Sequence, residues 1–140
     1  MSFRSNYAPK PQSDLAQTPF KDAEEAWFWF VQNQMAREDG ARIAAGLSLV
    51  KRPCEPVDIY KIMERLYRGR RLLMDHILVL RHYGRRLMSP DPRRPKEMRA
   101  HKLWIEALSK MEEAMVSKGI VEEKTMSWFQ MELEKGEVYA

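Results

Sequence analysis

Apolar residues recur at helical spacing in several stretches of the chain. Ile59, Met63 and Leu66 fall at i, i+4 and i+7, and a longer stripe joins Trp104 to Met115. This spacing places one face of each segment against a core. The pattern predicts helices over residues 19–37, 56–68, 73–83 and 95–118. A fifth helix is expected over 125–135, with a strand as the alternative there.

Capping residues and glycines mark the ends of these helices. Asp22 followed by Glu25 matches a capping box, while Thr18, which precedes a proline, is an alternative start for the same helix. Gly84 and Gly119 directly follow the third and fourth predicted helices. Both glycines are therefore expected to end their helices in the left-handed conformation.

The connections between the predicted helices indicate how the helices are arranged. Residues 1–18 are polar and predict a flexible tail, which leaves residues 19–140 as a single helical domain. Connectors of roughly ten residues, one of them containing Pro90 and Pro92, do not suit a simple up-down bundle. The expected fold is all-α, with four to five helices in an irregular, orthogonal array around one core.

Four aromatic residues stand side by side on the first predicted helix: Trp27, Phe28, Trp29 and Phe30. Consecutive helical residues point around most of the helix circumference, so the four rings cannot all enter one core face. Either this helix is central and wrapped by the others, or some rings are exposed as a protein interface, for example in a homo-oligomer.

Composition narrows the class of protein. The 140 residues are 44% hydrophobic, which is typical of a globular domain, and Cys54 is the single cysteine, so no internal disulfide can form. The first twenty residues lack the apolar stretch of a secretory signal, and no apolar run reaches the roughly 20 residues that a membrane span needs. The sequence therefore predicts a cytoplasmic protein with no membrane association.

Positive charge is concentrated in one part of the chain. Residues 61–102 contain thirteen Lys or Arg and four acids, whereas the remaining residues are net negative. Ten of these cations are Arg, whose planar fork suits phosphate and carboxylate oxygens. We expect residues 65–102 to contact a nucleic acid, with DNA favoured over RNA. The candidate contacts are Arg68, Arg70, Arg71, Arg85, Arg86, Arg93, Arg94, Lys96, Arg99 and Lys102.

Two alternatives to nucleic-acid contact remain open for this basic segment. It could face an acidic protein partner, in an interaction or adapter protein that also uses the aromatic cluster. It could instead be a solvated face, neutralised by the acidic segment 106–140.

Signals for catalysis and metal binding are missing from the sequence. His76 and His82 are spaced for different helix faces, and His101 has no nearby cysteine, so no metal site is expected. Cys54 lies between two prolines with no evident activating base. With no Gly-rich phosphate loop or nucleophile elbow, the sequence predicts a protein that is not an enzyme and takes no cofactor.

The central part of the chain resembles uncharacterised small helical proteins of bacterial and prophage genomes. The likeness runs over about half the chain, between Pro53-Cys54 and Gly119-Ile120-Val121. The residues that carry it within that span are Asp58-Ile59-Tyr60, Arg70-Arg71-Leu72, His76 with Leu80, Tyr83-Gly84, Leu103-Trp104 and Glu106-Ala107-Leu108. It is also similar to phage late-gene regulators with sigma-factor-like helical cores. This resemblance implies DNA binding in transcription regulation and implies no catalytic residue.

A helix-turn-helix arrangement would give the basic residues separate roles. The helix over 95–118 would enter the major groove through its N-terminal residues Lys96, Arg99 and Lys102. The arginines outside this helix would neutralise phosphates. The connector before this helix is about ten residues long, whereas a standard motif uses three or four. The loop over 85–94 is therefore an alternative contact surface.

Overall fold

The computed structural model describes residues 17–39 and 50–123, and every structural statement below concerns these residues. They form α2 (Ala23–Asp39), α4 (Pro56–Arg68), α5 (Met74–Arg86), the short 3-10 helix η2 (Pro95–Glu97) and α6 (Met98–Ser117). The all-α fold is confirmed. The fifth helix expected over 125–135 lies outside the described residues. Gly40 follows the first predicted helix, and this position favours a helix stop, but this residue lies outside them too.

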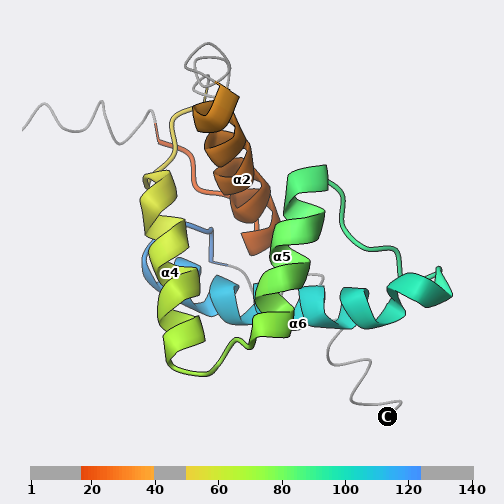
Figure 1. The fold of residues 1–140 in the computed structure, drawn as a ribbon. Coiled ribbons are helices and arrows are strands. Elements are labelled where there is room, and N and C mark those ends of the chain that lie inside the picture. The colour runs from red at the N-terminus through yellow and green to blue at the C-terminus, as the bar shows by residue number, and fades with distance from the viewer. Residues whose placement is uncertain (1–16, 40–49, 124–140) are drawn as a thin grey trace, which may run out of the picture.

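The helices form an irregular array, as the long connectors predicted. α6 lies across the lower parts of α4 and α5 (Figure 1). α2 packs against all three of these helices, and α6 also packs against α4 and α5. One hydrophobic cluster joins them, with Ile59, Leu80, Trp104 and Leu108 fully buried. Each of the four described α-helices contributes to the same core, so none of them stands as a separate unit.

The aromatic cluster of residues 27–30 lies in the core, because α2 is wrapped by the other helices. Trp27 and Phe30 are buried at 3% and 6% exposure, and Phe28 and Trp29 are partly buried against the same cluster. The Trp27 indole N–H donates to the Leu80 carbonyl oxygen at 2.9 Å. The expectation that Trp27 and Phe30 could serve as exposed interface anchors is wrong, and the alternative of a central helix is confirmed.

The start of α2 is held by its own cap and by α6. Asp22 Oδ1 accepts the Glu25 N–H at 2.9 Å, so Asp22 and not Thr18 is the cap. Glu25 Oε1 accepts the N–H of Lys21, one residue earlier than in a standard capping box. The buried carboxylate of Glu112 on α6 accepts the Ala23 N–H at 2.9 Å. A helix start that would otherwise carry bare N–H groups is thereby satisfied.

Gly84 does not end α5, which is a correction to the sequence-based expectation. The helix continues to Arg86 and ends at Leu87, whose φ of 53° is left-handed. Gly84 is instead buried inside the helix, where an added Cβ would lie 2.7 Å from Trp27 Nε1 and 3.0 Å from Val31 Cγ2. This glycine therefore serves the close approach of α2 to α5 and not the helix end.

The end of α6 matches the prediction. Gly119 has a φ of 77°, and the Ile120 N–H donates to the Met115 carbonyl oxygen at 2.9 Å, as in a Schellman turn. Ile120 and Val121 are buried, and Val121 forms an isolated bridge with Phe20. The segment after α6 therefore lies beside the residues that precede α2.

Three smaller expectations are corrected by the structure. The predicted tail of residues 1–18 is too long, because the Thr18 N–H donates to the Lys51 carbonyl oxygen at 2.8 Å. Residues 1–16 lie outside the described part. Met98 and Leu78 are apolar residues of the helices predicted over 95–118 and 73–83 and were expected to face the core, but they are 59% and 52% exposed.

Candidate nucleic-acid interface

All thirteen Lys and Arg residues of the 61–102 segment have exposed side chains. The four acids of the segment are less exposed than the cations. Glu64, Asp91 and Glu97 are partly buried, and only Asp75 is exposed. The helices α4, α5 and α6 bury their apolar stripes and turn these cations outward. The charge excess seen in the sequence is therefore a property of the molecular surface.

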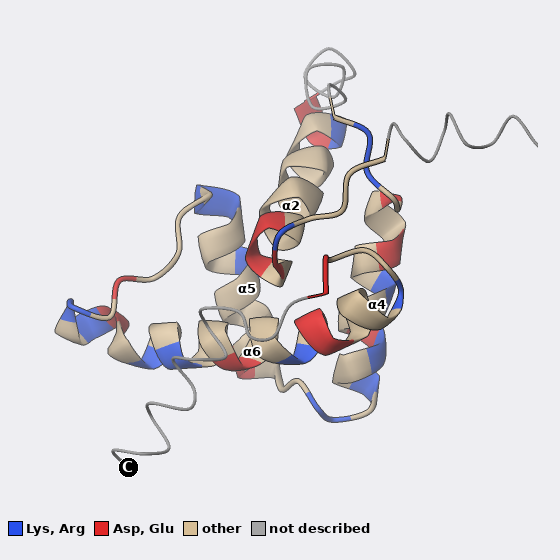
Figure 2. Ribbon diagram, turned by 180° about the vertical axis from the view of Figure 1, so that it is seen from behind, with Lys and Arg blue, Asp and Glu red and all other residues tan. Residues whose placement is uncertain are grey.

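The ten candidate contacts fall into three groups by element, and the second and third of these border the same pocket. One is the turn between α4 and α5, one is the end of α5, and one is the corner formed by η2 and the start of α6 (Figure 2). The structure thus does not bring all ten together. The groups are Arg68, Arg70 and Arg71 at the turn; Arg85 and Arg86 at the end of α5; and Arg93, Arg94, Lys96, Arg99 and Lys102 at the corner.

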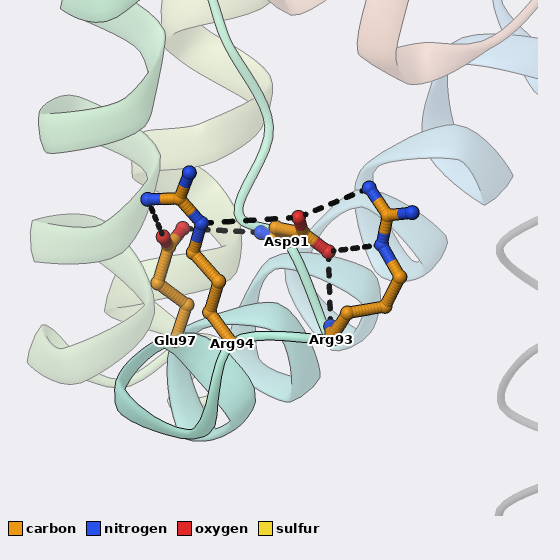
Figure 3. Close-up of polar contacts among 4 residues, drawn as sticks. All are labelled: Asp91, Arg93, Arg94 and Glu97. Carbon is orange, nitrogen blue, oxygen red and sulfur yellow. Dashed lines mark hydrogen bonds and ion pairs between the residues drawn. The ribbon is translucent and has the colours of Figure 1, made fainter.

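Acids of the same loop hold the arginines of the corner group. The Asp91 carboxylate accepts hydrogen bonds from the Arg93 N–H at 2.9 Å and from Arg93 Nε at 3.1 Å (Figure 3). These bonds, with the charges of Arg93 and Arg94, hold the pKa of Asp91 below its usual value. Glu97 accepts the Asp91 N–H at 3.0 Å and pairs with Arg94 Nη1 at 3.7 Å. The loop is fixed in place while its guanidinium groups stay in solvent.

The corner group also borders a pocket of about 340 Å³ between the end of α5 and η2. Arg86, Arg94 and Lys96 line it together with Tyr83. Burial raises the pKa of the Tyr83 hydroxyl, with the nearby Glu97 carboxylate adding to the effect. The tyrosine therefore stays neutral and can donate or accept a hydrogen bond at the pocket wall.

Ion pairs connect α6 with the start of α5 and with the turn between α4 and α5. Arg99 Nη2 lies 2.7 Å from Asp75 Oδ2, and Arg71 Nη2 lies 3.5 Å from Glu113 Oε1. Arg99 and Glu113 are fourteen residues apart on α6, which is about 21 Å at 1.5 Å per residue. The turn group and the start of α6 therefore lie about four helical turns apart along α6.

Four of the ten candidates have no ion pair with an acid within residues 17–39 and 50–123: Arg70, Arg86, Lys96 and Lys102. Arg70 also has a φ of 63°, although its neighbour Gly69 has an ordinary φ of −81°. A left-handed arginine beside a glycine that does not take that conformation carries a backbone cost. This turn therefore combines a strained backbone at Arg70 with a guanidinium that pairs with no acid of the described residues.

His76 has a structural role that the sequence did not reveal. Its ring is 5% exposed at the start of α5. Nδ1 accepts the Leu73 N–H at 3.0 Å, and Nε2 lies 3.0 Å from Glu106 Oε1. Because Nδ1 is an acceptor, Nε2 carries the proton and donates it to the carboxylate. His76 thus caps α5 and fastens it to α6.

The geometry of the described residues offers little support for metal binding or for a reactive cysteine. Across the described ranges, no three His, Cys, Asp or Glu side chains gather in a group that could hold a metal ion. Cys54 is half-buried, and burial with the nearby Asp58 and Glu55 raises its thiol pKa to about 12. No described helix is both long and apolar enough to pass through a membrane.

Comparison of the chain with protein-family models, with curated proteins and with solved structures finds no match. The resemblance to phage regulators therefore stays a prediction.

Proposed function

We propose that this chain is a non-enzymatic nucleic-acid-binding protein that contacts duplex DNA, in the manner of a small bacterial or phage transcription regulator. The observation that carries the proposal is the exposure of all thirteen cations of residues 61–102. Cations that are free to meet phosphates supply most of the affinity in non-specific DNA binding. The raised pKa of the Cys54 thiol supports a protein without a cysteine nucleophile.

The ion pairs on this surface do not oppose the proposal. Arg93 and Arg99 pair with acids, but their side chains stay 89% and 74% exposed. Exposed pairs contribute about 0–1 kcal/mol, so a phosphate can replace the carboxylate at small cost. The residues without an acid partner, above all Arg70 and Lys102, are the stronger contacts.

The proposed contacts divide by position. Arg70 and its neighbours in the turn lie on one phosphate strand, and Lys96, Arg99 and Lys102 at the start of α6 lie toward the groove. The connector between α5 and η2 spans residues 87–94, so the arrangement is not a tight helix-turn-helix. Binding through two separated groups predicts affinity for duplex phosphates before any preference for sequence.

Fluorescence anisotropy with a labelled arbitrary duplex, at about 50 and about 200 mM salt, tests the proposal. Affinity should fall steeply between these salts, because each neutralised phosphate adds about 0.9 to the slope of log K against log salt. The double variant Arg70→Gln/Lys102→Gln should lower that slope by about two. Lys21→Gln/Arg37→Gln is the matched control, since it removes two exposed cations outside the segment.

Two results would refute the proposal. One is no binding at the lower salt, which would leave an acidic protein partner as the remaining use of the basic surface. The other is equal weakening by the test and control variants, which would show that net charge alone attracts the duplex.

A further inference from the structure

A second basic site lies between α4 and the end of α6, away from the corner group. A pocket of about 240 Å³ opens between α4 and the C-terminal end of α6, which packs against α4 (Figure 1). Its apolar floor is formed by the buried Ile62 and Ile120. Drug-sized ligands occupy pockets of about 300–1,000 Å³, so this pocket suits a smaller molecule.

Three cations line this pocket from opposite walls. Lys61 and Arg65 stand one turn apart on α4, and Lys118 caps the end of α6. Like charges four residues apart on a helix repel each other, and Lys118 adds a third positive charge from more than fifty residues away in the sequence. The positive charge at this pocket therefore comes from packing of α6 on α4, which brings together cations that are distant in the sequence.

Within residues 17–39 and 50–123, no acid pairs directly with these cations. Neighbouring arginines have carboxylate partners, as in the Arg68–Glu64 pair at 3.1 Å. Lys61, Arg65 and Lys118 form no ion pair with any acid of the described ranges.

The two remaining polar groups of the pocket compensate this charge only in part, because the Asp58 carboxylate offsets one of the three cations. Asp58 Oδ2 accepts the Glu55 N–H at 2.8 Å, so this carboxylate is engaged in capping α4. The Cys54 thiol also lines the pocket and stays neutral, because burial raises its pKa to about 12. The lining therefore keeps a net positive charge around a partly apolar cavity.

We propose that this pocket binds the phosphoryl group of a small phosphate monoester. A terminal phosphate is a dianion, so it matches three cations better than the monoanionic diester of a nucleic-acid backbone. The Arg65 fork can hold two phosphate oxygens, and the lysines supply single charges. The floor of Ile62 and Ile120 receives the apolar part of the ligand.

This site shares α4 with the turn group of the proposed DNA interface, but it lies at the opposite end of α6 from the corner group. Lys118 follows the last residue of α6, whereas Lys96 and Arg99 stand at its start. A helix of 20 residues is about 30 Å long. One ligand group therefore cannot touch both Lys118 and the corner group, and Lys118 can be replaced without changing the proposed DNA contacts.

The test is titration of the full chain with inorganic phosphate, followed by backbone amide chemical shifts at constant ionic strength. A parallel titration with phenyl phosphate tests the apolar floor. We expect shift changes centred on Cys54, Lys61 and Ile120, and tighter binding of the ester than of the free ion. Lys118→Gln and Arg65→Gln should each weaken binding about tenfold, the loss of one charge-assisted hydrogen bond.

Arg81→Gln is the matched control, because Arg81 is an exposed cation of α5 outside this pocket. It should leave phosphate affinity unchanged. Shifts no larger than those in chloride, or equal weakening by Arg81→Gln and Lys118→Gln, would overturn the proposal. Lys118→Gln should bind duplex DNA as the unmodified chain does. Failure of the phosphate site alone would thus leave the proposed DNA interface standing.

Discussion

Replacing Gly84 by Ala tests whether the contact between α2 and α5 depends on a missing side chain. In a helix interior, Ala is favoured over Gly by about 1 kcal/mol. At this position the new Cβ would stand 2.7 Å from Trp27 Nε1 and 3.0 Å from Val31 Cγ2. Forcing an extra carbon into packed surroundings costs about 1–3 kcal/mol. Displacing the indole also weakens its bond to the Leu80 carbonyl, which contributes about 1 kcal/mol.

Taken together, these opposing terms lower the free energy of unfolding of the Gly84→Ala protein by about 2 kcal/mol. Urea unfolding followed by Trp fluorescence measures it, and the midpoint should fall by about 1 M at an m value near 2 kcal/mol/M. The same substitution in a Trp27→Phe background should cost less, because the clashing Nε1 atom is gone. A Gly84→Ala protein that is as stable as the original, or more stable, would refute this account of the glycine.

Three further predictions concern single residues. Leu87→Gly should stabilise the protein by about 1 kcal/mol in urea unfolding, because Leu87 is exposed and has a left-handed φ of 53°. Burial raises the pKa of Glu24, which accepts the Trp104 indole N–H at 2.8 Å. The folded state therefore holds the Glu24 proton more tightly than the unfolded state, and stability falls as pH rises from the unfolded pKa through the folded one. Glu24→Gln keeps the acceptor and should remove this decline, as thermal unfolding between about pH 4 and 7 would show; an unchanged pH dependence would contradict it. The Cys54 thiol, with a pKa of about 12, should react with iodoacetamide at pH 8 at least tenfold more slowly than a free thiol with a pKa of about 8.5. An ordinary labelling rate would show that burial does not control this thiol.

Local signals predicted the parts of the fold that depend on neighbouring residues. The bounds of α4 follow from Pro56 at its first turn and from Gly69 after its last residue. The Schellman turn at Gly119 was equally readable, because the glycine is followed by two apolar residues.

Contacts between distant residues account for what the sequence could not show. The role of Gly84 depends on Trp27, more than fifty residues earlier, and no pattern around the glycine reveals that approach. The pocket cations were missed for the same reason, since Lys118 joins Lys61 and Arg65 only through packing of α6 on α4. The charge count located the basic segment but could not show that the turn between α4 and α5 holds one set of its arginines, or that Arg86 and Arg94 border one pocket.

The attachment of α2 to the far end of the described chain has a consequence for synthesis. Glu112 holds the first N–H of α2, and Val121 bridges to Phe20. A chain that emerges from its N-terminus must therefore carry the aromatic residues of α2 uncovered until α6 has been made. Their burial is completed only by contacts about a hundred residues apart in the chain, which places a slow step late in folding. Chaperones that shield apolar segments would meet this protein at residues 27–30 before it is fully synthesised.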